Sequence, residues 1–163
     1  MTATQERPRV VFDCMVFLQG AARLHSPSGL CLLLAEHGVI ELCVSVDVLR
    51  EIADVLRRPR VRAKFPSLTA DVVEEFMRAL NRMTTLFPDV PHEISFSRDP
   101  KDEPYLNLVL RAQAHYLVSR DKDLLGLNIV NDSTGEKLRH RCPQLQILEP
   151  VSFIAALKEE PRA

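Results

Sequence analysis

Short apolar runs alternate along the chain with longer segments whose apolar residues recur at helical spacing. Four β-branched or aromatic runs end at polar positions and predict buried strands: 9–12, 39–44, 84–87 and 116–119. Lesser strand candidates, separated by a polar stretch, are 128–131 and 146–148. Helical spacing predicts helices over 30–37, 45–58, 69–83, 99–114 and 151–157, with a turn or short helix at 122–125. Gly20, Pro27 and Gly29 predict a loop over 19–28, and Pro59 predicts a helix end.

Strands that alternate with helices favour an α/β fold with a mainly parallel central sheet. The length of 163 residues suits a single domain with one core, about 9–157. Apolar residues make up 46% and charged residues 26%, so a disordered, collagen-like or coiled-coil chain is not expected. Lys and Arg number 21 against 22 Asp and Glu, a net charge of −1, so any nucleic acid must be bound by a local cluster rather than by an overall basic surface.

The cysteines favour a reducing, cytoplasmic setting. Cys14, Cys31, Cys43 and Cys142 form no CxxC pair, and three of them lie in apolar runs, so we expect buried, reduced thiols. The first ten residues carry no apolar core of a signal peptide, and no apolar run approaches the roughly 18 residues of a membrane helix. We therefore expect neither export nor membrane insertion.

Acidic residues follow the predicted strands at the positions where ligands bind to parallel sheets. Asp13 ends the first strand and Asp121 follows the strand at 116–119, while Asp102 opens a helix and Glu51 lies one turn into the helix after the second strand. If these four side chains converge at the carboxyl edge of the sheet, their hard oxygen atoms favour Mg²⁺ or Mn²⁺. Such a site can activate a water molecule and neutralise charge on a phosphodiester.

Each acidic residue also has an ordinary structural interpretation. Asp102 could only cap a helix, a role for which Asp99 competes, and Glu51 could lie on a solvated helix face. Asp121 and Asp123 flank Lys122 in a probable turn, where aspartate is common. A metal site is indicated by the placement of these residues together at the carboxyl edge of the sheet, not by any one of them alone.

Four segments together resemble the PIN-domain family, and within it the PIN-fold toxins of bacterial toxin–antitoxin pairs: VVFDCMVF, VDVLREIADVLRRP, DPKDEPYLNLVLRAQAHYLVSRDKDLL and LQILEPVSFIAAL. The resemblance implies a three-layer α/β/α fold and a Mg²⁺- or Mn²⁺-dependent ribonuclease that cleaves single-stranded RNA. It implies that Asp13, Glu51, Asp102 and Asp121 are catalytic. Asp13, Asp102 and Asp121 would bind the metal, with Asp123 in support. It also implies a small antitoxin protein as partner and a homodimer.

Two positions depart from the family pattern. Met15 stands where the family often has an asparagine, and it can neither donate a hydrogen bond to a phosphate nor orient a water molecule. Arg120 stands in a turn where the family usually has a glycine, and it could contact phosphate or lower the pKa of Asp121. A weakened or inactive PIN-fold binding module is therefore the alternative function. A third function is a phosphoryl-transfer enzyme with Asp13 as nucleophile, but such an enzyme would need a second acid at position 15, so Met15 argues against it.

Basic residues that could bind an RNA backbone lie just after the helix that carries Glu51: Arg57, Arg58, Arg60, Arg62 and Lys64. We expect Arg57, Arg58 and Arg120 to bind substrate, although a charge run is more often a solvated face. A smaller basic candidate is the segment Arg139, His140 and Arg141.

Overall fold

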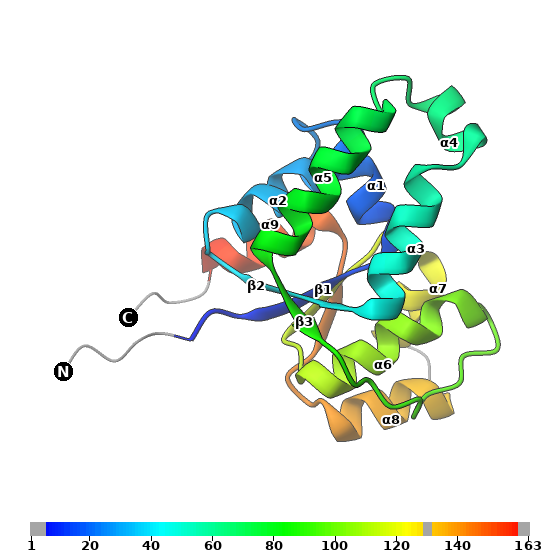
Figure 1. Ribbon diagram of the computed structural model, residues 1–163. Coiled ribbons are helices and arrows are strands. Elements are labelled where there is room, and N and C mark those ends of the chain that lie inside the picture. Colours follow the sequence, from blue (N-terminus) through cyan, green and yellow to red (C-terminus); the bar gives the residue numbers. More distant parts are fainter. Residues whose placement is uncertain (1–5, 129–131, 160–163) are drawn as a thin grey trace.

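Five short strands form one sheet in the computed structural model, which describes residues 6–128 and 132–159 (Figure 1). The strands are β1 (Arg9–Phe12), β2 (Glu41–Ser45), β3 (Thr84–Phe87), β4 (Tyr116–Val118) and β5 (Gln146–Leu148). All neighbouring pairs are parallel, in the order β3-β2-β1-β4-β5. The predicted α/β class with a parallel central sheet is confirmed.

Helices cover both faces of this sheet. Nine α-helices lie within the described residues: α1 (Cys14–Ala22), α2 (Pro27–Glu36), α3 (Val46–Leu56), α4 (Pro59–Lys64), α5 (Ala70–Met83), α6 (Glu103–Ala112), α7 (Lys122–Leu125), α8 (Ser133–Arg141) and α9 (Pro150–Glu159). The 3₁₀ turns η1 (Pro100–Asp102) and η2 (Gly126–Asn128) precede α6 and follow α7. Figure 1 shows α6 and α8 on one side of the sheet and α2, α5 and α9 on the other. The structure is therefore three-layered.

The central strand β1 is buried on both faces. Val10, Val11 and Phe12 have no exposed surface, and the Phe12 ring packs 6.3 Å, centroid to centroid, from Phe153 of α9. Burial of each such side chain contributes roughly 1.5–3 kcal/mol. A continuous apolar run is thus required here, because helices cover both sides of the strand.

The strand order reverses between β1 and β4. After β1 the chain moves outward to β2 and β3 and then returns to place β4 on the other side of β1. In parallel sheets the ligand crevice forms at such a reversal, at the carboxyl ends of the strands. Phe12 pairs with Val118, so the residues that follow them, Asp13 and Ser119, emerge side by side at this crevice.

The predicted loop over 19–28 is wrong in its first part, because α1 begins directly after Asp13 and runs to Ala22. Gly20 does not break this helix. A Cβ atom at Gly20 would lie 2.4 Å from a methyl carbon of Leu32 and 3.0 Å from the Ser28 carbonyl oxygen, so glycine permits the close approach of α1 and α2.

Two further differences concern the polar segments. The predicted helix over 45–58 ends at Leu56, and Pro59 then occupies the first turn of a separate helix, α4. The polar stretch before β5 contains α8, which begins where the Asp132 side chain accepts the Gly135 N–H at 2.7 Å. In the strand candidate 128–131, Asn128 belongs to η2, and 129–131 lie outside the described residues.

The four cysteines are free thiols, as expected, and Cys31, Cys43 and Cys142 are buried. Among the helices of the described residues, none has the length and apolar character needed to cross a bilayer.

Candidate active site

Asp13 joins the end of β1 to the start of α1. Its N–H donates to the Val118 carbonyl (3.1 Å), and one carboxylate oxygen accepts the Val16 N–H (3.0 Å), which caps α1. The other oxygen accepts the Ser119 hydroxyl. Burial, aided by the charge of Asp121, raises the pKa of Asp13 to about 6, although both hydrogen bonds act in the opposite direction. Asp13 is thus fixed in place and titrates near neutral pH.

Ser119 links Asp13 to Asp121. It has no exposed surface; its O–H group donates to Asp13, and the hydroxyl oxygen accepts the Asp121 N–H at 2.9 Å. Asp121 in turn caps α7 by accepting the Asp123 N–H at 2.8 Å. The two strand-end acids therefore share one hydroxyl group that sets their separation.

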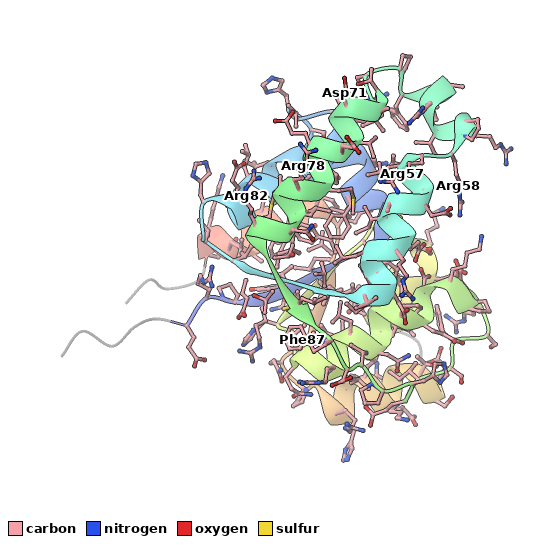
Figure 2. The ribbon with its side chains drawn as sticks, viewed as in Figure 1. Arg57, Arg58, Asp71, Arg78, Arg82 and Phe87 are labelled. Carbon is pink, nitrogen blue, oxygen red and sulfur yellow. The ribbon has the colours of Figure 1, made fainter. Side chains whose placement is uncertain are left out.

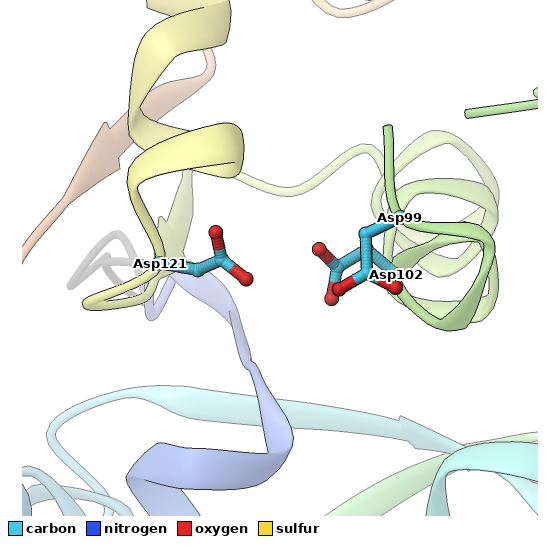
Figure 3. Close-up of side chains that lie close together, drawn as sticks. All are labelled: Asp99, Asp102 and Asp121. Atoms are coloured by element: carbon cyan, nitrogen blue, oxygen red, sulfur yellow. The ribbon is translucent and has the colours of Figure 1, made fainter. Parts of the chain in front are cut away.

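Three carboxylates from two separate segments meet at this crevice. Oxygen atoms of Asp99, Asp102 and Asp121 all lie within 4.8 Å of one another. Figure 3 shows the Asp121 carboxylate pointing across a short gap toward Asp99 and Asp102. Asp99 also starts η1, because its side chain accepts the Lys101 N–H at 3.1 Å. Asp99 therefore caps η1 and belongs to the carboxylate cluster at the same time.

Asp102 is the acid whose surroundings most favour a bound cation. The residue is 9% exposed, and its Oδ2 atom is buried without a hydrogen-bond partner among the described residues. Burial, followed by the charges of Asp99, Asp121, Asp13 and Glu51, raises its pKa to about 7. A cation between the three carboxylates would offset their repulsion, and an all-oxygen donor set suits Mg²⁺ or Mn²⁺.

The acidic cluster opens into a cavity of about 430 Å³. All four of the acids expected from the sequence line it, together with a fifth: Asp13, Glu51, Asp102, Asp121 and Asp99. Glu51 comes from α3, which begins where the Ser45 hydroxyl accepts the Val48 N–H at 3.1 Å. Burial raises the pKa of Glu51, against the opposing effects of the Tyr105 hydroxyl and Arg58.

Three other side chains in this cavity affect its chemistry. Tyr105 is 1% exposed, and its hydroxyl group lowers the pKa of the neighbouring Glu51. Burial, followed by the charge of Glu51, raises the pKa of the Cys14 thiol to about 12, which keeps it protonated and a poor nucleophile. Met15, 44% exposed, adds no polar group.

Basic side chains also line the cavity, but not all of those expected to bind substrate. Arg58 does, together with Arg60, Lys64 and Lys101. Arg58, an exposed residue that follows α3 (Figure 2), is paired with Asp54 at 2.6 Å. Arg57, Arg120 and Asp123 are exposed and are not among the lining residues.

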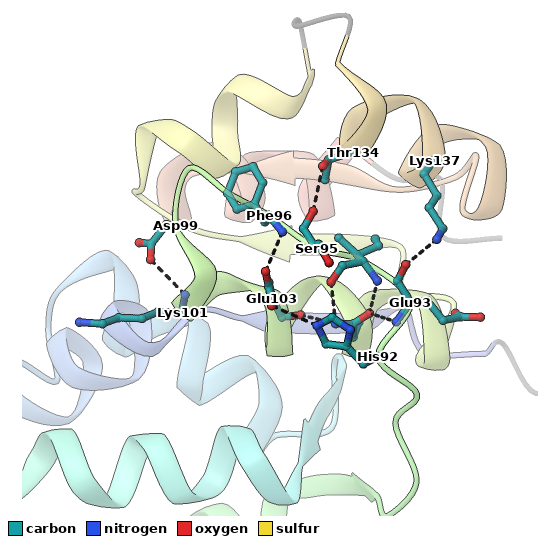
Figure 4. Close-up of polar contacts among 11 residues, drawn as sticks. His92, Glu93, Ser95, Phe96, Asp99, Lys101, Glu103, Thr134 and Lys137 are labelled. Carbon is teal, nitrogen blue, oxygen red and sulfur yellow. Dashed lines mark hydrogen bonds and ion pairs between the residues drawn. The ribbon is translucent and has the colours of Figure 1, made fainter.

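The segment 88–99, which leads into η1, is fastened to α6 and α8. Asn107 accepts the Glu93 and Ile94 N–H groups, both at 2.8 Å, and donates to the Ile94 carbonyl at 3.3 Å. Glu103 accepts the Phe96 N–H at 2.8 Å. Figure 4 shows these contacts with those of His92 to Glu103, Thr134 to Ser95 and Lys137 to Glu93. These bonds hold Asp99 and Asp102 opposite Asp121.

A PIN domain family model matches residues 9–123, a stretch that contains β1 to β4 and every acid of the cavity. The chain belongs to the PIN domain family. PIN domains are usually nucleases, which typically use divalent metals, and an acidic crevice at a strand-order reversal fits that chemistry. Searches of curated proteins and of solved structures gave no match.

Two polar residues of this PIN domain site were not singled out from the sequence. The sequence indicates Asp99 only as a helix cap and Ser119 only as the last residue of the strand predicted over 116–119. The sequence signal for Asp99 is its spacing: two aspartates that flank Pro100 at i and i+3 lie on one face of a helical turn. Ser119 is the residue directly after β4, one position before the exposed Arg120.

Proposed function

We propose that this PIN domain is a Mg²⁺- or Mn²⁺-dependent endoribonuclease that hydrolyses phosphodiester bonds of single-stranded RNA. One observation carries the proposal. Asp102 has a buried, unpartnered carboxylate oxygen, and its carboxylate lies with those of Asp99 and Asp121 at the carboxyl edge of the sheet, in a cavity that Asp13 also lines. An uncompensated group of acids this close is unfavourable unless a cation binds there.

Asp102, Asp121 and Asp99 would hold the ion, with Asp13 beside them as a further ligand. When bound, Mg²⁺ or Mn²⁺ supplies activation of water and neutralisation of charge on the phosphate. Asp123 supports the site through its N–H, which donates to Asp121 and fixes that carboxylate. Ser119 keeps Asp13 oriented.

Glu51 is the group we assign to proton transfer. It lines the same cavity, and its raised pKa makes the carboxylate a stronger base toward the attacking water. Arg58, Arg60 and Lys64 line the cavity too and are suited to contact the phosphate oxygens of the bound strand. In this one cavity, the acids thus serve metal binding and proton transfer, and the basic side chains serve phosphate binding.

We further propose that the enzyme is a cytoplasmic toxin, restrained by a small antitoxin protein, and that it forms a homodimer. The support is an apolar groove of about 510 Å³ between α2 and α9, which exposes Leu24, Leu30, Leu33 and Val151. An exposed apolar surface of this kind suits a protein partner. Light scattering on the purified chain tests the dimer, and a monomer at all concentrations would refute it.

A PIN-fold module that binds RNA without cleaving it is the second candidate, and Met15 favours it. This side chain lies in the cavity and offers no hydrogen bond to the substrate. RNA binding without metal-dependent cleavage in the wild type, together with cleavage restored by Met15→Asn, would support this alternative.

The deciding experiment incubates purified protein with mixed single-stranded RNAs in Mn²⁺, Mg²⁺ or EDTA. Asp13→Asn and Asp102→Asn variants are compared with Asp71→Asn, an exposed aspartate on α5 (Figure 2). We expect cleavage that requires metal, persists in Asp71→Asn and is lost in the other two variants. Equal cleavage by all proteins would indicate a contaminating nuclease and would refute the assignment.

A further inference from the structure

A second cavity adjoins the acidic one and has the opposite charge. It measures about 320 Å³ and shares Lys64 and Phe65 with the wall of the acidic cavity. Its cationic side chains come from three parts of the fold: Arg23 follows α1, Lys64 ends α4 and Arg120 follows β4. Residues remote in sequence are thus brought together around one hollow.

These cations are not neutralised by the protein. No carboxylate oxygen within the described part of the chain lies within 4.0 Å of Arg23, Lys64 or Arg120, in contrast to Arg58 and Arg98, which are ion-paired. The cavity lining contains one acid, Glu149, against the three cations. The hollow therefore keeps a net positive charge that can attract an anion.

The walls of this cavity are fixed by neighbouring groups. Arg23 and Lys64 lie over the Phe65 ring, at 5.5 and 5.6 Å from its centroid, and the ring itself is buried. Arg120 donates to the Gln19 side chain at 3.3 Å. Anchored cations lose less conformational freedom when they bind a ligand than free surface cations do.

Two ten-residue helices also begin at this cavity. Pro27 and Ser28 start α2, and Pro150 and Val151 start α9. The amino-terminal end of a helix carries a partial positive charge, so both ends add to the field of the cations.

We propose that this cavity binds a backbone phosphate of the substrate RNA next to the scissile bond, with Arg23 and Arg120 as its ligands. The inference rests on the proposed nuclease function. A strand whose scissile phosphate lies at the carboxylates passes over Lys64 and Phe65 and places a flanking phosphate between Arg23 and Arg120. The subsite fixes the strand's direction through the acidic cavity without reading its bases.

The first test compares the double variant Arg23→Gln/Arg120→Gln with Arg82→Gln, which removes one exposed charge from α5 (Figure 2). Binding of a fluorescent single-stranded RNA is measured by anisotropy in EDTA, where no cleavage occurs. Each phosphate contact on a single strand contributes about 0.7 to the slope of log Kd against log salt, so the double variant should lower the slope by about 1.4. Arg82→Gln should leave the slope unchanged, and an equal loss in that variant would overturn the proposal.

A second test locates the phosphate. Oligoribonucleotides with one neutral methylphosphonate at each successive position are cleaved by the wild type and by the double variant. At one position beside the scissile bond, the neutral linkage should lower wild-type kcat/KM roughly 10-fold through KM and leave the double variant unaffected. If the wild type and the double variant differed in kcat/KM by the same factor wherever the neutral linkage lies, the attraction would be diffuse. That result would refute the subsite.

The two proposals fail in different ways. Without metal-dependent cleavage by the wild type, the nuclease assignment fails, while the anisotropy series in EDTA still tests whether Arg23 and Arg120 bind a backbone phosphate. Arg120→Gln alone, which leaves the Phe65 ring and its stacked cations in place, should lower the slope by about 0.7 and guards against a folding defect in the double variant.

Discussion

Asp102→Asn should stabilise the metal-free protein at alkaline pH while abolishing metal-dependent cleavage. The substitution keeps the shape of the side chain and removes a charge that four neighbouring acids repel. Folding raises the pKa of Asp102 from 3.8 to about 7. At about 1.4 kcal/mol for each pH unit, the ionised form costs the folded state at most about 4 kcal/mol.

Water in the open cavity and relaxation of the neighbouring acids lower this cost, so we expect about 2 kcal/mol. For a chain of this length, that difference raises Tm by about 4–8 °C. Because the pKa is higher in the folded than in the unfolded state, wild-type stability falls as pH rises from about 4 through about 7. The difference in Tm between variant and wild type should therefore be largest at pH 8, and it should disappear below about pH 4.

The assay is thermal unfolding in EDTA at a series of pH values, with Asp71→Asn as the control for loss of an exposed charge. Added Mn²⁺ should then raise the Tm of the wild type at pH 8 more than that of Asp102→Asn, since the ion stabilises only the state that binds it. An Asp102→Asn variant less stable than the wild type at pH 8 would show that this carboxylate is not repelled in the folded protein, and the argument for a cation site would lose its basis.

Three other substitutions test how the cluster is held. Ser119→Ala removes the hydroxyl shared by two acids, so we expect a 10- to 100-fold loss of activity and a more alkaline pH optimum for cleavage, because Asp13 loses a hydrogen bond that lowers its pKa. Asn107→Ala leaves one buried and one partly buried N–H group of the segment 88–99 unpartnered, which should destabilise the protein by about 2–4 kcal/mol in urea unfolding. Asp99→Asn should lower Mn²⁺ affinity in calorimetry at least 10-fold, whereas the exposed Asp123→Asn should change it less than about threefold; equal effects would contradict the cluster.

The sequence could predict the sheet and its acidic edge because both follow from local patterns. A buried parallel strand needs an uninterrupted apolar run, and an acid directly after it must lie at the carboxyl end. Asp13 and Asp121 were found in this way. The strand order, which brings them together, depends on long-range pairing that no local pattern contains.

The helices that the sequence did not predict lack an amphipathic pattern. Among the residues of α1, five are buried, including Val16, Phe17 and Leu18 in succession, so the helix has no polar stripe. Only Gly135 and Leu138 of α8 are buried, so that helix has no apolar stripe. Its cap by Asp132 is local, but its bonds to the segment 88–99 are tertiary contacts.

Three of the cavity acids have a second role in the backbone, and this decides how the site must be tested. Asp13 caps α1, Asp99 caps η1 and Asp121 caps α7, each by accepting a backbone N–H. Alanine would remove cap and charge together, at a cost of roughly 0.5–2 kcal/mol for each cap, whereas asparagine caps about as well as aspartate. A loss of activity in the asparagine variants with unchanged Tm therefore reports the charge itself. Loss only in the alanine variants would mean that these aspartates serve the fold, and it would refute their assignment to the metal site.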